Sequence, residues 1–235
     1  MPDIALRFHK DMLVVSSPIA AALARQGVDT DRDLELMTIL EPDSLQEAMR
    51  LESMTGAQCL VTNTAGITPA RMAQVGMDDR ARDVAHASIE VLCALKPQHV
   101  LVEIGPCGLP LDSSSKASLN ENRSQYARAA RLFEDEQFDA FFLNGFSTTS
   151  DLLCALMGVR QVSDMPVFAS VDVLEDGVLA SGRGTLEEAC AIMGEYGASV
   201  AGFATTGGIE EACALAKRVE ASCDLPVLAQ LVVVE

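Results

Sequence analysis

The sequence predicts an α/β protein with a parallel sheet, and three observations support this fold class. Short β-branched runs alternate with longer helical segments about seven times along the 235 residues, as expected of strands joined by helical crossovers. The runs are almost continuously apolar, which is typical of strands covered on both faces. Aromatic residues make up only 4% of the chain, so we expect an aliphatic core. Such alternation fits a doubly wound sheet or a (β/α)8 barrel, and the spacing does not choose between them.

Seven apolar segments are predicted to be strands. In chain order they cover residues 12–15, 59–61, 100–104, 140–143, 167–171, 200–203 and 227–234. No G-x-G-x-x-G motif follows the first of them, which argues against a dinucleotide-binding fold. The last segment is strongly apolar and has no helix after it in the sequence, so its outer edge would favour aggregation if left open. We therefore expect a homo-oligomer, or a partner chain, to cover this seventh strand.

The segments between the strands carry local signals for helix ends. Asp43 or Ser44 can cap a helix that Gly56 can end. Thr185 and Glu188 lie three residues apart and form a capping box, in which each side chain bonds the backbone N–H of the other residue. These signals place helices between predicted strands, as the alternation requires.

The charge and the cysteines limit the compartment and the partners. The chain has 17 basic and 34 acidic residues, a net charge of −17, which repels phosphate backbones and anionic lipids and argues against nucleic acid or membrane partners. The N-terminus lacks a signal-peptide pattern, and no apolar stretch approaches the roughly 20 residues of a membrane span. None of the seven cysteines forms a C-x-x-C pair. We expect reduced thiols, a cytoplasmic location and a single domain over residues 1–235.

Four stretches resemble the homocysteine S-methyltransferase family, which includes the first barrel of cobalamin-dependent methionine synthase and betaine–homocysteine methyltransferase. They read G-A-Q-C-L-V-T-N-T-A-G at 56–66, I-G-P-C-G at 104–108, D-G-V-L-A-S-G-R-G-T-L-E-E-A at 176–189 and Y-G-A-S-V-A-G at 196–202. Their order and spacing match the family over nearly the whole chain. The resemblance implies a (β/α)8 TIM-barrel fold, incomplete here with about seven strands, and a site at the carboxyl ends of the strands.

The resemblance also implies a zinc site, whose ligands are missing from this sequence. In the family, three cysteine thiolates hold a zinc ion that keeps the homocysteine sulfur as a thiolate. The position of the first of these cysteines, after strand six, falls here at Ala204 or Thr205, and the two cysteines of strand eight have no counterpart in the sequence. We therefore expect no zinc and no other cofactor. Cys107, in the loop after the third predicted strand, is the only candidate for a metal ligand or nucleophile, and a small buried residue is the alternative interpretation.

Polar, mostly uncharged side chains remain at the expected catalytic end. The predicted substrate-binding residues are Ser16, Asn63, Thr64, Asn144 and Thr205. Asp172 is the nearest acid and the predicted general base. Asn144 stands where the family has a glutamate after strand four, and the first strand lacks the acid and glycines that line the family's homocysteine pocket. This rim can bind a small neutral or zwitterionic ligand, or it can be a solvated barrel mouth.

Three functional interpretations follow. The chain is a methyltransferase-family enzyme of one-carbon or corrinoid metabolism that transfers, or assists the transfer of, a methyl group without zinc. Alternatively it is a catalytically inactive barrel that binds or regulates a corrinoid protein or a partner methyltransferase. In the third interpretation a separate chain supplies strand eight. The expected partners are a small-molecule methyl donor or acceptor and a corrinoid protein, while the sequence names neither the donor, corrinoid or other, nor the acceptor.

Overall fold

The computed structural model describes residues 3–8, 10–30 and 32–232, and these residues contain a parallel sheet in the order β1-β2-β3-β4-β5-β6. The strands are β1 Cys59–Val61, β2 His99–Ile104, β3 Ala140–Phe146, β4 Val167–Asp172, β5 Val200–Thr205 and β6 Val227–Leu231. The α-helices are α1 Ala20–Arg25, α2 Leu34–Leu40, α3 Pro42–Met54, α4 Pro69–Gln74, α5 Ala81–Cys93, α6 Lys116–Arg131, α7 Thr149–Arg160, α8 Leu186–Glu195 and α9 Ile209–Ser222. Two 3-10 turns, Ile4–Leu6 and Asp78–Arg80, complete the regular elements.

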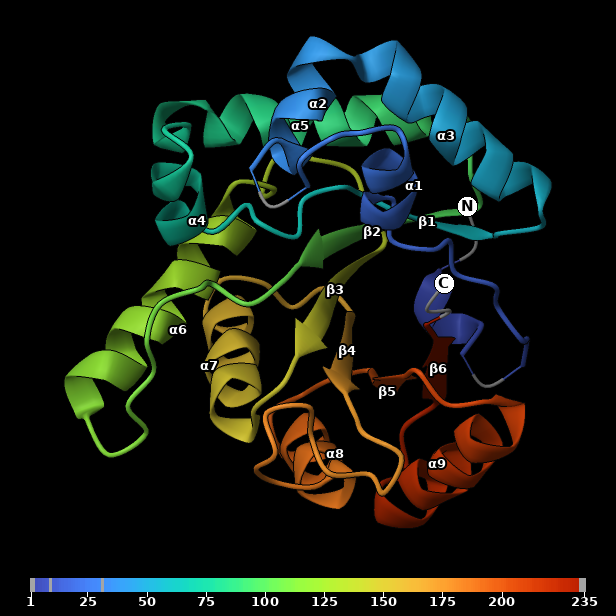
Figure 1. Cartoon of the computed structure of the whole chain (residues 1–235), viewed down its shortest axis with the longest axis vertical. Helices are drawn as coiled ribbons and strands as arrows, with labels where there is room; N and C mark the ends of the chain where they lie inside the picture. The colour runs from blue at the N-terminus through green and yellow to red at the C-terminus, as the bar shows by residue number, and fades with distance from the viewer. Residues whose placement is uncertain (1–2, 9, 31, 233–235) are drawn as a thin grey trace.

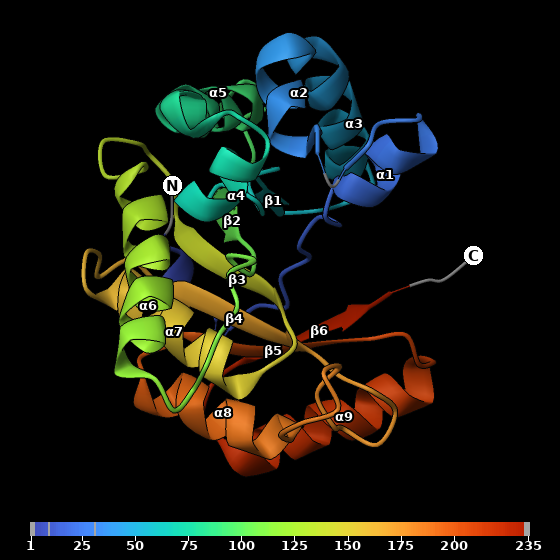
Figure 2. The same ribbon diagram turned by 60° about the vertical axis from the view of Figure 1, so that its left-hand side comes forward.

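The sheet curls into an open half barrel with helices along its outer side (Figure 1). In the turned view the ribbon forms a C, with α2, α3 and α5 on one arm and α8 and α9 on the other (Figure 2). Each strand pairs in parallel with the next strand in sequence, so the order of the strands around the curl follows their order along the chain. This confirms the predicted α/β fold of incomplete (β/α)8-barrel type.

The first predicted strand, at residues 12–15, is reduced to one bridge. Val15 pairs in parallel with Cys59, and the Ser16 N–H donates to the Cys59 carbonyl at 2.8 Å. Met12 is 90% exposed and Val14 is 46% exposed, so this apolar run is not covered on both faces as a central strand would be. The last predicted strand ends at Leu231, and its residues 233 and 234 lie outside the described part of the chain.

Side chains of alternate strand residues point to opposite faces of the sheet and form two apolar clusters. The cluster inside the curl holds Ile4, Cys59, Val61, Leu101, Ala140, Phe142, Phe168 and Val200. Ile4 is 1% exposed, and Phe8 meets Phe168 edge to face with ring centroids 5.2 Å apart. The N-terminal segment therefore packs against the inner face of the barrel. The larger cluster lies between the outer face of the sheet and the helices.

The helix-end signals are confirmed in part. Thr185 and Glu188 form the predicted capping box at the start of α8, and Gly56 follows the end of α3 with a positive φ of 102°. The predicted cap of α3 at Asp43 or Ser44 is wrong, because the helix already begins at Pro42. Proline suits the first helical position, where its missing N–H costs no hydrogen bond, so the helix starts earlier than the polar residues suggested. No helix in the described part of the chain is long and apolar enough to cross a membrane.

Gly158 sets the close approach of α7 to α6. A Cβ atom added to Gly158 would lie 2.5 Å from the Arg123 carbonyl oxygen and 2.8 Å from Tyr126 Cβ. We expect Gly158→Ala to lower the free energy of unfolding by on the order of 1 to 2 kcal/mol, because overpacking against backbone outweighs the gain in helix propensity. Urea unfolding followed by circular dichroism measures this change.

Gly194 in α8 provides the matched control, because a Cβ atom there meets nothing within 4 Å. We expect Gly194→Ala to stabilise the protein by up to about 1 kcal/mol. Equal effects of the two substitutions would contradict the tight packing of α6 on α7.

The outer edge of β6 has no partner strand among the described residues, since β6 pairs with β5 alone. Leu231 is 46% exposed and Val232 is 48% exposed beside it. Open edges of this kind associate with other chains. We predict a particle of more than one chain in size-exclusion chromatography with light scattering, and a stable monomer at micromolar concentration would contradict this.

Candidate functional site

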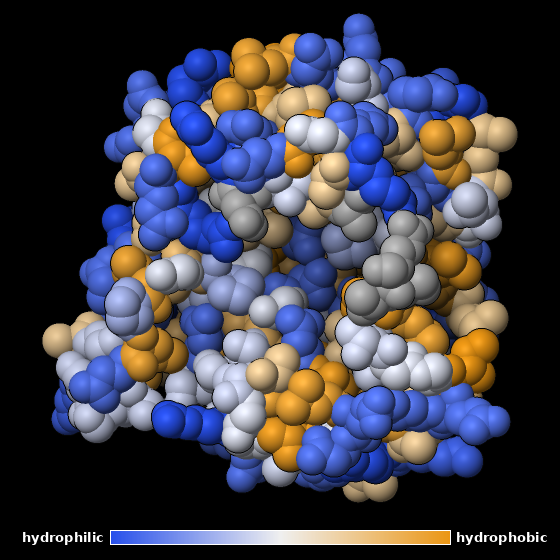
Figure 3. Space-filling model, viewed as in Figure 1, coloured by the Kyte–Doolittle hydropathy of each residue, from blue (hydrophilic) through white to orange (hydrophobic). Residues whose placement is uncertain are grey.

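A layer of polar side chains crosses the inside of the half barrel near the carboxyl ends of its strands. It consists of Glu103 on β2, Asn144 on β3, Ser170 on β4 and Gln230 on β6. Each lies two residues beyond a side chain of the inner apolar cluster, namely Leu101, Phe142, Phe168 and Leu228, so all four face inward. The surface in Figure 3 is hollowed near its centre, and hydrophilic side chains show inside the hollow.

Hydrogen bonds connect these four side chains to one another. Asn144 Nδ2 donates to Glu103 Oε1 at 2.8 Å. Gln230 Nε2 donates to Asn144 Oδ1 at 3.0 Å and to Ser170 Oγ at 2.7 Å. β5 lies between β4 and β6 and places Gly202 beside Ser170 and Ala204 beside Gln230, so only small residues lie between the two strands and the Gln230 side chain can reach past them. The layer is therefore one connected network drawn from four strands.

Glu103 is the acid of this network, and it is almost completely enclosed. The residue is 5% exposed, and no ion pair reaches it from the residues that the structure describes. Burial raises the pKa of Glu103 to about 7, the Asn144 hydrogen bond opposes that rise, and the nearby Glu35 carboxyl adds to it. A carboxyl group with this pKa changes its protonation state close to neutral pH.

Glu35 is a second buried acid beside the network. It lies on α2, is 7% exposed and accepts the Gly66 N–H at 2.5 Å through Oε1. Burial raises the pKa of Glu35, while the Gly66 hydrogen bond and the positive charge of Arg71 act in the opposite direction. A Cβ atom on Gly66 would lie 2.6 Å from Glu35 Oε1, so a larger residue there would displace the Glu35 carboxyl group. The acid thus fixes the loop that follows β1.

Two threonines hold the backbone at the end of β2. Thr62 Oγ1 accepts the Glu103 N–H at 3.0 Å, and the Thr64 hydroxyl donates to the Glu103 carbonyl at 2.7 Å. The two hydroxyls are 2.6 Å apart. The Thr62 hydroxyl, the Thr64 hydroxyl and the Glu103 backbone are all buried and are bonded to one another. These bonds fix the position of the Glu103 backbone before any ligand binds.

Of the five predicted substrate-binding residues, Asn144 alone belongs to the polar layer. Ser16 Oγ accepts the Val61 N–H at 3.0 Å. Asn63 Nδ2 donates to the Leu34 carbonyl and the Thr38 hydroxyl on α2, and Thr64 is bonded to the Glu103 backbone. The Thr205 hydroxyl donates to Glu211 at 3.0 Å. These four side chains shape the walls around the layer, and direct binding of substrate by any of the five stays a prediction.

Asp172, the predicted general base, lies two residues beyond Ser170 on β4 and on the same face. It is half-buried, and burial raises the pKa of its carboxyl. No hydrogen bond or ion pair to this carboxylate is found among the described residues. The geometry leaves it able to accept a proton or to bind a cationic group, and its catalytic role stays a prediction.

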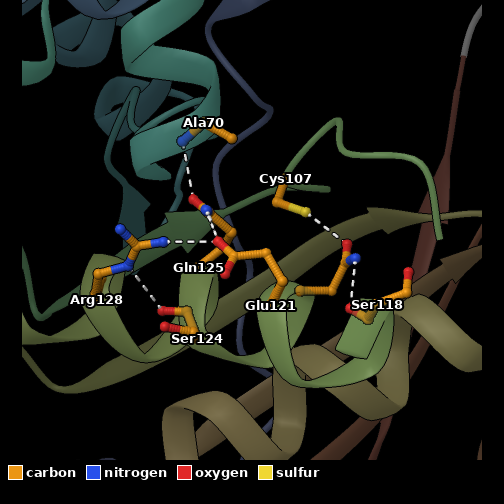
Figure 4. A network of polar contacts seen from close by, with 8 residues as sticks. Ala70, Cys107, Ser118, Glu121, Ser124, Gln125 and Arg128 are labelled. Carbon is orange, nitrogen blue, oxygen red and sulfur yellow. Dashed lines mark hydrogen bonds and ion pairs between the residues drawn. The ribbon is translucent and has the colours of Figure 1, made fainter. Parts of the chain in front are cut away.

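Cys107 lies in the loop after β2 and is fully buried. Its thiol donates to Asn122 Oδ1 at 3.0 Å, and Asn122 in turn bonds the Ser118 carbonyl on α6 (Figure 4). The Cys107 N–H donates to the Tyr126 hydroxyl at 2.9 Å. Burial raises the pKa of the Cys107 thiol, which favours the neutral form and weakens it as a nucleophile or metal ligand. Either chemical role stays a prediction.

A neighbouring set of contacts in Figure 4 attaches α4 to α6. Gln125 Oε1 accepts the Ala70 N–H at 2.9 Å, and Gln125 Nε2 donates to Glu121 at 2.7 Å. Arg128 donates to the same Glu121 carboxylate at 3.0 Å. Together with the Cys107 contacts, these bonds position the loops that follow β1 and β2 at the barrel mouth.

Sequence reasoning missed Glu103, Glu35 and Gln230 as site residues. Glu103 is the only charged residue within the apolar run 100–104, and Gln230 is the only amide in 227–231. A single polar residue inside a strand buried on both faces needs a partner there. That signal could have found two of the three, whereas Glu35 shows no comparable pattern in its helix.

A family model for homocysteine S-methyltransferase matches residues 16–232. The chain belongs to the homocysteine S-methyltransferase family. No curated protein was found to match the sequence.

Solved structures of a family enzyme share this fold. The metallated form of the homocysteine methyltransferase MmuM from Escherichia coli has a TM-score of 0.79 and 16% identity, covering 96% of this chain and 86% of that one. Its oxidized form has a TM-score of 0.80 and 17% identity, covering 96% and 84%. At these identities the likeness shows the fold alone, and that fold is the family's barrel.

Ala204 and Thr205, where the resemblance places the family's first zinc ligand, do not fit zinc. Ala204 offers only a methyl group, and the Thr205 hydroxyl already bonds Glu211 and accepts the Gly207 N–H at 3.1 Å. Over the described ranges, no three His, Cys, Asp or Glu side chains gather in a metal-binding arrangement. Neutral hydroxyl and methyl groups are poor zinc ligands compared with thiolate or imidazole.

The raised pKa of Glu103 predicts a pH-dependent stability. Since folding raises this pKa from its ordinary value of 4.5 to about 7, the folded state holds the proton more tightly than the unfolded chain. Its stabilising contribution is complete below about pH 4.5 and is lost as the pH rises towards about 7. We expect Glu103→Gln to gain about 2 to 3 kcal/mol in unfolding free energy relative to wild type between these pH values.

Urea unfolding at several pH values between 4.5 and 8 measures this difference. Glu187→Gln is the control, because Glu187 is a surface acid whose pKa is lowered by its hydrogen bond to Arg218. Its difference from wild type should stay flat between pH 5 and 8. A flat difference for Glu103→Gln as well would show that Glu103 does not titrate in the folded protein.

Proposed function

We propose that this chain binds a small polar methyl acceptor at the barrel mouth and takes part in methyl transfer without the family's zinc ion. The polar layer of Glu103, Asn144, Ser170 and Gln230 is the observation that carries the proposal. Its residues come from four strands and meet at the carboxyl end of the barrel, where barrel enzymes place their sites. A mixed set of amide, hydroxyl and carboxyl groups suits a small zwitterion such as an amino acid.

The geometry suggests how such a ligand is held. The Asp172 carboxylate, which pairs with no other described residue, can bind an ammonium group, and the Asn144 and Gln230 amides can bond polar atoms of the ligand. Ser16, Asn63, Thr64 and Thr205 contribute the surrounding walls through the contacts they make within the protein. Cys107 stays a structural thiol in this proposal.

The setting that we propose is one-carbon metabolism in the cytoplasm. All seven cysteines are free, which suits a reducing compartment. The methyl donor is a small molecule or a corrinoid carried by a partner protein. The net charge of −17 favours a cationic donor over an anionic one, because a negative field concentrates cations at the mouth.

A second function is an inactive barrel that binds a corrinoid protein or a partner methyltransferase. The observation that favours it is the unpaired outer edge of β6, with Leu231 and Val232 exposed beside it. Methyl transfer measured with the chain alone separates the two functions, since an inactive binder gives no product.

Calorimetric titration with L-homocysteine tests the location of the site. We expect Asn144→Ala to weaken binding about 10-fold, the effect of one lost hydrogen bond to a polar or charged group. Asn120→Ala is the matched control, because Asn120 is exposed on α6 and bonds only Arg123. Unchanged affinity in Asn144→Ala would place the site elsewhere.

A further inference from the structure

We propose that Glu103 is the catalytic base that removes the proton of a thiol acceptor during methyl transfer, in place of the family's zinc-bound thiolate. This inference rests on the proposed function and adds the residue that activates the acceptor. The residues at the family's first zinc-ligand position are Ala204 and Thr205, so thiol activation in this chain needs another group. Glu103 is the buried acid of the polar layer near the carboxyl ends of the strands.

The geometry of Glu103 leaves one oxygen for chemistry. Oε1 accepts the hydrogen bond from Asn144 at 2.8 Å, whereas no described residue donates to Oε2. Only 5% of the Glu103 surface is exposed to solvent. The Thr62 and Thr64 hydroxyls fix the Glu103 backbone on both sides. A base that is held in place before the substrate arrives needs little reorganisation during the reaction.

The surroundings of Glu103 contain carboxyl, amide and hydroxyl groups, and no cation among the described residues pairs with it. Glu35 on α2 is a nearby charge, and Asn144 on β3 bonds Glu103 directly. Gln230 on β6 bonds Asn144 and Ser170 on β4, so these two side chains connect to Glu103 through Asn144. Asp172 lies one inward position beyond Ser170 on β4. Burial and the Glu35 charge keep the pKa of Glu103 near neutrality, at about 7. An ordinary thiol has a pKa of about 8.5, so the two groups are close enough for efficient proton transfer.

The proposed step balances with a cationic methyl donor, a sulfonium or a quaternary ammonium compound. The thiol sulfur forms a bond to the methyl carbon, and the bond from that carbon to the donor heteroatom breaks. The electron pair of the broken bond goes to the heteroatom, and the S–H proton goes to Glu103 Oε2. The products are a thioether, a neutral leaving group and a protonated Glu103, which then returns its proton to solvent.

The test measures methyl transfer to L-homocysteine from S-methyl-L-methionine, S-adenosyl-L-methionine and glycine betaine, each with a deuterated methyl group, between pH 5.5 and 9. For wild type we expect kcat/KM to rise with pH through about 7 as Glu103 loses its proton. Glu103→Gln should lower kcat at least 100-fold and abolish this rise. Its affinity for L-methionine, which has no S–H proton, should stay within about threefold of wild type, because Gln keeps the bond with Asn144.

Two further variants test the assignment of Glu103 as the base. Glu103→Asp keeps a carboxyl group and should retain the rise at a reduced rate. Glu35→Gln keeps an acceptor for the Gly66 N–H and removes a nearby negative charge, so the rise should move to lower pH without disappearing. Circular dichroism at pH 7 establishes that each variant is folded.

The possible results distinguish a wrong assignment of the catalytic base from a wrong proposed function. Turnover in Glu103→Gln with the wild-type pH profile overturns the assignment of the base. Loss of the rise in Asp172→Asn with its retention in Glu103→Gln assigns the base to Asp172 instead. Absence of labelled product from wild type with every donor, while homocysteine still binds, overturns the proposed methyl transfer and this inference with it.

Discussion

The structure of the site depends on one constraint, the cost of burying a carboxyl group inside a sheet. A buried carboxyl is tolerated when it is neutral or hydrogen-bonded. At Glu103 the surrounding strands supply an amide from β3, and the end of β2 is tied by hydroxyls from the β1 loop. The parallel register of β1, β2 and β3 brings these groups to one level. The strand register therefore supplies the hydrogen bonds that allow Glu103 to be buried.

The alternation of apolar runs and helical segments predicted the fold class because a parallel sheet requires it. Six of the seven predicted strands are present in the sheet. Residues 12–15 fail as a strand because Met12 and Val14 face solvent. Apolar composition alone does not reveal whether a neighbouring strand covers both faces, and that depends on contacts with residues more than 40 positions away.

The site was predicted less completely than the fold, and the reason is again long-range contact. Asn144 was found because it follows the predicted strand segment 140–143, whereas its partners on β2 and β6 were not found. Asn63 has the same side chain and a similar place at a strand end, yet it is bonded to α2. Local pattern gives the residue type at a strand end, while the direction of the side chain and its partner come from the assembled barrel.

The position of Gln230 on an edge strand links the site to assembly. Gln230 completes the polar layer, but within the described part of the chain its strand pairs on one side only, with β5. A chain that pairs with the free side of β6 would restrict the same backbone that carries Gln230. Any coupling between ligand affinity and association of that chain would be reciprocal, so each would change the other by the same factor.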